Sequence, residues 1–160
     1  MYLKSISGKV LFESQEDNIK DAIQEAAKLS VKLDGVNLRK CNLNNIQLNG
    51  VRMKGACLWG ACLNNAAIIG CGLEAADLRL ANLSNGSLEN SILSGADFRG
   101  AKLNKLNLKN TDISYCYFSD PTFFDLNLHE VRNIFQTVYT ARGEADYLVE
   151  EFLNSKVKII

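Results

Sequence analysis

The sequence predicts an all-β solenoid, in which the chain winds into a four-sided coil of short parallel strands. Two observations predict this fold: an apolar residue recurs at every fifth position, and a small residue usually stands two positions before it. With 47% apolar residues in the chain, chance gives such a run about once in a million for a fixed phase. All nineteen positions of the series are apolar: Leu33, Leu38, Leu43, Leu48, Met53, Leu58, Leu63, Ile68, Leu73, Leu78, Leu83, Leu88, Leu93, Phe98, Leu103, Leu108, Ile113, Phe118 and Phe123.

A period of five fits neither an α-helix nor a long strand, whose side chains repeat every 3.6 and 2 residues. It fits a three-residue strand followed by a two-residue corner. We call each such five-residue unit a word. The stretch "ACLWGACLNN" (56–65) contains two words, with Ala56 and Leu58, then Ala61 and Leu63, at the inward positions. Four words close one coil, which pairs with the next coil as in a parallel sheet. Small and large residues alternate because eight large side chains would overfill a narrow, close-packed interior.

These words resemble the motif A(D/N)LxX of the pentapeptide-repeat proteins. Four words match it closely: "ADLRL" (76–80), "ANLSN" (81–85), "ADFRG" (96–100) and "AKLNK" (101–105). The resemblance covers residues 31–125 and implies a right-handed quadrilateral parallel β-helix of about five coils, roughly 24 Å long. Larger residues occupy the small position near both ends, where we expect wider coils: Val31, Val36, Ile46, Val51, Leu106 and Pro121.

Residues 1–30 are predicted to form an N-terminal cap of strands and a helix. Two short apolar segments flank the Ser7-Gly8 turn and form an edge that can pair with the first coil. Ser14, followed three residues later by Asp17, marks the expected helix start. One face of that helix is apolar, through Ile19, Ala22, Ile23, Ala26 and Ala27.

Residues 126–160 are predicted to form a C-terminal helical segment. One apolar helical face comprises Val131, Ile134, Phe135, Val138 and Tyr139, and a second, after Gly143, begins at Ala145. The segment is either a cap or a homodimer interface. We favour the dimer, because the segment is more apolar than one core opening requires. Members of the resembling family that act on topoisomerases also dimerise through this end. The candidate interface residues are Leu148, Val149, Phe152, Leu153 and Ile159.

Composition limits the cellular compartment and the classes of binding partner that we expect for this protein. A formal net charge of zero gives no electrostatic reason to expect a nucleic acid or an anionic membrane as partner. The apolar run at the N-terminus is too short for a signal peptide, and no stretch is long enough to span a bilayer. The five cysteines lack metal-binding spacing, and Cys57 and Cys62 fall at outward positions. We therefore expect one cytoplasmic domain without a metal or cofactor.

Catalytic signals are weak. The single histidine, His129, removes most acid–base and nucleophile–base arrangements. Asp77 and Asp97 are twenty residues apart and should stack about 5 Å apart, as in retaining glycosidases. Arg79 and Arg99, two positions after each, should neutralise them on a convex surface without a cleft. We therefore expect no enzymatic activity.

One outward column is unusual. Its residues are Arg39, Trp59, Arg79 and Arg99, so we expect Trp59 to be exposed and stacked between guanidinium groups. Tryptophan and arginine are enriched at binding hot spots. Together with Asp77 and Asp97, these residues form the candidate partner-binding stripe.

The favoured function is a non-enzymatic scaffold that binds an unidentified protein. An alternative implied by the family is binding of DNA gyrase or another topoisomerase through resemblance to DNA. The charge argues against it, since residues 31–125 carry ten Lys/Arg against eight Asp/Glu, a balance of +2, whereas DNA mimics are strongly acidic. Another alternative is a structural component of a phage particle or a larger assembly, because bacterial and phage members share this layout.

Overall fold

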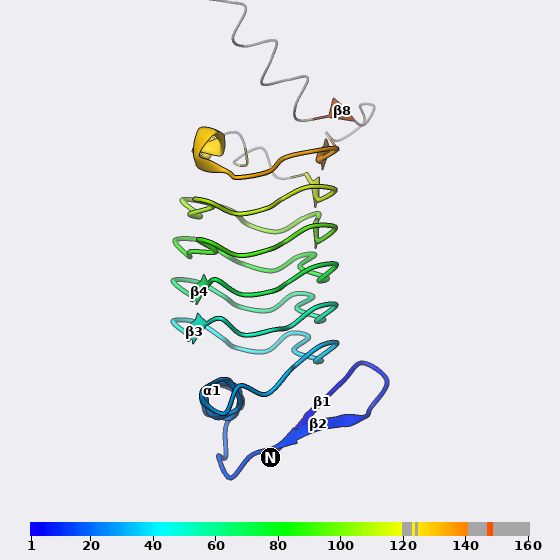
Figure 1. Ribbon diagram of the computed structural model, residues 1–160, viewed down its shortest axis with the longest axis vertical. Helices are drawn as coiled ribbons and strands as arrows, with labels where there is room; N and C mark the ends of the chain where they lie inside the picture. The colour runs from blue at the N-terminus through cyan, green and yellow to red at the C-terminus, as the bar shows by residue number, and fades with distance from the viewer. Residues whose placement is uncertain (120–122, 124, 141–146, 149–160) are drawn as a thin grey trace, which may run out of the picture.

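The computed structural model describes residues 1–119, 123, 125–140 and 147–148. The chain forms a stack of coils, with α1 and the β1–β2 hairpin at the N-terminal end (Figure 1). Four series of parallel bridges, each linking residues twenty apart, give the coil four sides. They run through Asn37, Cys57, Asp77 and Asp97; Asn42, Cys62, Asn82 and Lys102; Gln47, Ala67, Ser87 and Asn107; and Arg52, Gly72, Ile92 and Asp112.

Most bridges are isolated, and six short strands stand out within or beside the ladders. β3 (Gln47–Asn49) pairs in parallel with β4 (Ala67–Ile69). β5 (Asp97–Phe98), β6 (Tyr117–Phe118) and β7 (Val138–Tyr139) form a second parallel ladder, to which β8 (Tyr147–Leu148) adds in antiparallel orientation. The strands are short because a corner interrupts each side after three residues.

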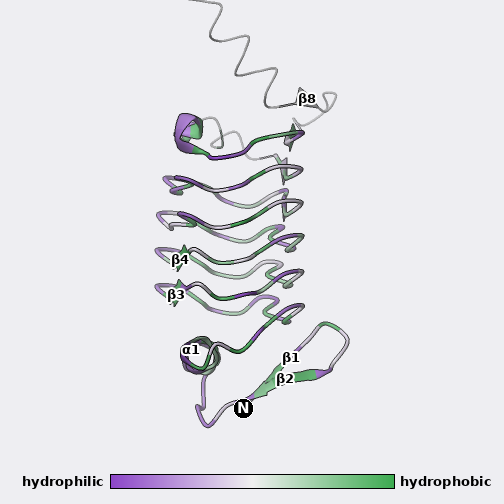
Figure 2. Cartoon of the chain, in the orientation of Figure 1, coloured by the Kyte–Doolittle hydropathy of each residue, from purple (hydrophilic) through white to green (hydrophobic). Residues whose placement is uncertain are grey.

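The inward positions form one continuous core. The nineteen residues of the five-residue series are all at most 3% exposed, which confirms the predicted register. The small residues between them, such as Ala56, Ala81 and Ala96, are equally buried. Figure 2 shows hydrophobic and hydrophilic residues alternating along the coils.

The corners are hydrogen-bonded turns. At a typical corner the amide of Cys41 donates to the carbonyl of Leu38 (3.1 Å), and that of Ala61 donates to Leu58 (3.0 Å). The second corner residue has a positive φ, as a type II turn requires. Glycine and asparagine adopt that conformation most readily, yet Lys40 (φ 56°) and Leu80 (φ 59°) also adopt it.

The N-terminal hairpin pairs with the first coil, as predicted. β1 (Tyr2–Lys4) and β2 (Val10–Glu13) are antiparallel, and a bridge joins Ser5 to Val36. The amide of Asn37 donates to the carbonyl of Lys4 (2.8 Å). The hairpin therefore covers part of the first coil's free edge.

The helix α1 (Ile19–Lys28) buries Ala22, Ile23 and Ala26 in the core that the coils share. It begins later than predicted, because Asn18 is the N-cap and accepts a hydrogen bond from the amide of Asp21 (3.0 Å). The Ser14 hydroxyl donates instead to the Glu25 carboxylate. Within the described ranges, no helix has the length and apolar character needed to cross a membrane.

The helix predicted over 131–139 is wrong. These residues extend the solenoid: Asn133 bridges Asp112, and β7 pairs with β6 through Phe118 and Tyr139. The step here is 21 residues, so one extra residue lies in the connection. A 3-10 helix, η2 (Leu128–Glu130), precedes this last turn. The apolar positions that suggested a helix also fit the five-residue period, since Ile134 and Tyr139 are five apart.

Candidate protein-interaction face

One side of the solenoid gathers all six residues of the predicted stripe. We call it the arginine face and define it by four words that lie one strand spacing apart, about 4.8 Å. Parallel bridges between Asn37, Cys57, Asp77 and Asp97 hold the words in register. The outward and corner residues are Asn37, Arg39 and Lys40; Cys57, Trp59 and Gly60; Asp77, Arg79 and Leu80; and Asp97, Arg99 and Gly100.

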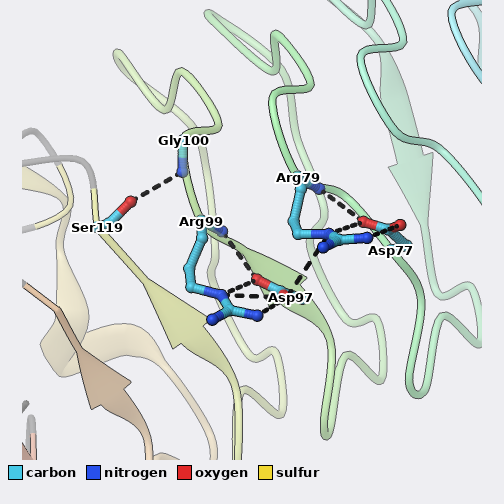
Figure 3. A network of polar contacts seen from close by, with 6 residues as sticks. All are labelled: Asp77, Arg79, Asp97, Arg99, Gly100 and Ser119. Atoms are coloured by element: carbon cyan, nitrogen blue, oxygen red, sulfur yellow. Dashed lines mark hydrogen bonds and ion pairs between the residues drawn. The ribbon is translucent and has the colours of Figure 1, made fainter.

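The C-terminal half of this face is a network of ion pairs (Figure 3). Arg79 donates from Nε and Nη2 to the two carboxylate oxygens of Asp77, both at 2.8 Å, and its Nε lies 3.8 Å from Asp97. Arg99 donates in the same way to Asp97, with Nε at 2.9 Å. Arg99 also lies over the ring of Tyr117, 5.5 Å from its centroid. Each arginine is therefore neutralised by the aspartate two positions earlier.

These contacts keep both carboxylates ionised. Hydrogen bonds from Arg79 hold the pKa of Asp77 below its usual range. Partial burial on its own raises the pKa of Asp97, but hydrogen bonds from Arg99 outweigh it, and the net pKa is lowered. The same pairs raise the pKa of Arg79 and of Arg99. Neither aspartate is therefore poised to hold a proton near neutral pH.

The N-terminal half is built around Trp59. The guanidinium carbon of Arg39 lies 4.2 Å from the ring centroid, and the Lys40 ammonium lies 5.3 Å from it. These distances are typical of cation–π contacts. The expected sandwich between two guanidiniums does not form, because Arg79 turns to Asp77 and Asp97. Trp59 is half-buried rather than exposed, and its cation contacts among the described residues come from Arg39 and Lys40.

Two glycines of this face have a side chain of the preceding coil close by. A Cβ on Gly60 would sit 3.6 Å from Cγ of Lys40, and a Cβ on Gly100 would sit 2.6 Å from Cδ2 of Leu80. Lys40 and Leu80 therefore lean over the glycine of the following coil. Lys40 was not among the predicted residues of the stripe, although its place one coil before Gly60 was a usable signal. Cys57 occupies an outward position, as predicted, but only 9% of it is exposed.

The predicted dimer interface falls largely outside the described residues. Leu148 lies in β8, so it is in a strand rather than the predicted helix. Val149, Phe152, Leu153 and Ile159 lie outside the described residues.

The solved structures that this chain resembles include a pentapeptide repeat protein of similar fold. The structure of alr5209 from Nostoc Pcc 7120 has a TM-score of 0.58 and 22% identity, over 81% of this chain and 99% of that one. QnrB1, a plasmid-mediated fluoroquinolone resistance protein, has a TM-score of 0.46 and 16% identity, over 77% of this chain and 62% of that one. The likeness to alr5209 establishes the fold and implies the right-handed quadrilateral β-helix.

The sequence comparisons give the family. No curated protein matches this sequence. The family model "Pentapeptide repeats" matches in eight copies over residues 32–66 and 76–120. These ranges contain the four words of the arginine face and span half of the chain, and the ladders repeat every twenty residues as four five-residue words require. The chain therefore belongs to the pentapeptide repeat family.

Proposed function

We propose that this protein is a non-enzymatic scaffold that binds a partner protein through the arginine face. The observation that carries the proposal is Trp59, held at the surface by Arg39 and Lys40. A coil needs only inward residues and corner formers, and Asn64 occupies the equivalent position on the next side. Folding therefore gives no reason for a tryptophan here, whereas binding does, because tryptophan and arginine dominate interface hot spots.

The state of the carboxylates supports a role without catalysis. A retaining glycosidase needs one carboxyl that keeps its proton and one that stays ionised. Asp77 and Asp97 are instead both paired with arginine, and both have lowered pKa values. The pair thus lacks the asymmetry that acid–base chemistry requires.

Affinity capture with matched variants tests the proposal. The full chain is immobilised, and retention of lysate proteins is compared between wild type, Trp59→Ser and Arg79→Glu. We expect Trp59→Ser to weaken retention of the partner by about 2 kcal/mol, roughly 30-fold, as for a hot-spot residue. Arg79→Glu should act in the same direction through reversed charge. Phe135→Ser is the control, because Phe135 is an exposed aromatic residue (52%) outside the arginine face.

If Trp59→Ser and Phe135→Ser retain the same proteins equally, the arginine face is not the binding surface. Purified DNA gyrase provides a separate arm, read out by supercoiling. We rank topoisomerase binding second, because a surface that replaces DNA must offer the negative charge of phosphates. The arginine face carries four cations, Arg39, Lys40, Arg79 and Arg99, against two aspartates.

A further inference from the structure

We infer that the N-terminal half of the arginine face, formed by Arg39, Lys40 and Trp59, binds an acidic segment of the partner protein. This inference rests on the proposed function and specifies the chemistry of the partner. It follows from a difference between the two halves of the face: the arginines of the C-terminal half form ion pairs with aspartates, whereas the cations of the N-terminal half form none among the described residues.

The difference begins at the position two residues before each arginine. Asp77 and Asp97 occupy it before Arg79 and Arg99, whereas Asn37 occupies it before Arg39. The same backbone to side-chain hydrogen bond forms in all three words. The arginine amide donates to the side-chain oxygen of Asn37 at 3.3 Å, of Asp77 at 3.2 Å and of Asp97 at 3.1 Å. Asn37 therefore keeps the turn and removes the counter-charge.

Arg39 and Lys40 are consequently unpaired within the part of the chain that the structure describes. The ion pairs there join Arg52 to Asp34, Arg79 to Asp77 and Asp97, and Arg99 to Asp97. The word after Arg39 adds no charge, since it places Cys57 and Trp59 at the corresponding positions. Two adjacent cations thus face solvent with an aromatic ring beneath them.

The geometry also holds these cations in place. Contact with the Trp59 ring restrains both long side chains, and the Lys40 stem also lies over Gly60, where a Cβ would sit 3.6 Å from its Cγ. Side chains that are ordered before binding lose less conformational entropy when they pair with a carboxylate. We therefore expect this site to bind carboxylates more tightly than two unrestrained surface cations would.

A second feature fixes the pattern of the ligand. Leu80 is 54% exposed and occupies the same corner column as Lys40, two coils further along. Two strand spacings are about 9.6 Å, which an extended peptide spans in roughly three residues. The structure therefore suits a segment with two acidic residues and an apolar residue about three positions away.

Fluorescence of Trp59 tests this directly, because it is the only tryptophan of the chain. The probe is a synthetic peptide with the sequence Glu-Glu-Ser-Ser-Leu inside a neutral Gly/Ser context, titrated into the full chain. We expect a saturable change in emission that weakens with added salt. The matched peptide with Gln-Gln in place of Glu-Glu should give none. A change of equal size with the Gln-Gln peptide would overturn the inference.

Two near-isosteric variants then move the affinity in opposite directions. Asn37→Asp supplies Arg39 with a counter-charge and should weaken peptide binding about three- to fivefold, the scale of an exposed ion pair. Asp77→Asn releases Arg79 and should strengthen binding by a similar factor. If both variants bind like the wild type, charge pairing on this face does not govern recognition and the inference fails.

A double variant, Arg39→Gln with Lys40→Gln, should abolish the signal. Its control is Lys105→Gln with Lys109→Gln, which removes the same charge elsewhere: Lys105 sits at a corner with φ 55°, close to the 56° of Lys40, and Lys109 precedes a corner residue as Arg39 does. Equal loss in both double variants, or tighter binding of an oligo-dT strand than of the acidic peptide, would overturn the inference. If the captured partner still depends on Trp59 while the peptide does not bind, the proposed function stands and only the inference is lost.

Discussion

Trp59 is half-buried, and Arg39 and Lys40 contact its ring at the surface. We therefore expect Trp59→Ser to lower the free energy of unfolding by no more than about 1 kcal/mol, the usual range for surface changes and the scale of an exposed cation–π contact. Urea denaturation followed by circular dichroism measures it. A much larger loss would show that the tryptophan serves the fold, which would remove the argument for a binding face.

The aspartates of the ladders make stability depend on pH. The pKa values of Asp77, Asp97 and Asp112 are lower in the folded chain than their ordinary value. A lowered folded pKa stabilises the fold at pH values above the ordinary aspartate pKa of about 3.9. This contribution is lost as the pH falls through the folded pKa values.

We therefore expect the urea concentration at the unfolding midpoint to decrease as the pH is lowered below about 4. The decrease should be less steep in the Asp97→Asn variant. The effect should be modest, because these carboxylates are partly exposed and solvent screens their ion pairs. Midpoints measured between pH 2.5 and 7 check it. An identical acid dependence in wild type and Asp97→Asn would contradict the assignment.

Within one coil, adjacent residues on the same side should respond differently when their side chains are enlarged. Ala66 points inward and is 4% exposed, whereas Ala67 lies beside it in β4 and points outward, partly exposed. Ala66→Leu overfills a packed interior and should cost about 1–3 kcal/mol or more. Ala67→Leu adds the same atoms on the surface and should change stability little. Equal losses in urea melts would mean that the inward and outward positions are not as the coil places them.

The regular coils could be predicted because one local rule decides them. Every central residue from Leu33 to Phe123 is buried, as the five-residue period required. The rule failed where two periods coincide: Ile134 and Tyr139 fit a helical face and a coil equally well. The segment forms a coil because Tyr139 pairs with the strand edge at Phe118. That pairing partner is distant in the chain, so local spacing carried no sign of it.

In the candidate site, the sequence predicted which residues share an outward column. It did not predict which of several possible contacts each side chain makes. Arg79 could reach either the Trp59 ring or the carboxylate of Asp77. It takes the carboxylate, because a bidentate charge-assisted hydrogen bond is stronger than an exposed cation–π contact. The part played by Lys40 likewise depends on its side chain lying over Gly60, which spacing alone does not define.

For the whole molecule, the sequence still predicts association through the C-terminal segment. Phe152 and Leu153 belong to an apolar series that exceeds the needs of a cap. We expect the wild type to be a dimer at micromolar concentration and Phe152→Asp to be a folded monomer, since coils depend mainly on their neighbours. Light scattering with circular dichroism measures both properties. A monomeric wild type would assign the segment to capping alone.

The twenty-residue step also sets which changes of length the protein can tolerate. Adding or deleting a whole coil between Gly60 and Asp77 would change the length of the rod, yet Trp59 and Arg79 would stay on one side. Adding a single five-residue word would preserve every core contact type but turn everything after it by a quarter of a revolution. The C-terminal half of the arginine face would then lie on a different side of the coil from Trp59. If selection maintains the arginine face, insertions and deletions in homologous sequences should therefore be multiples of twenty residues. Selection for folding alone would also accept insertions and deletions of five residues.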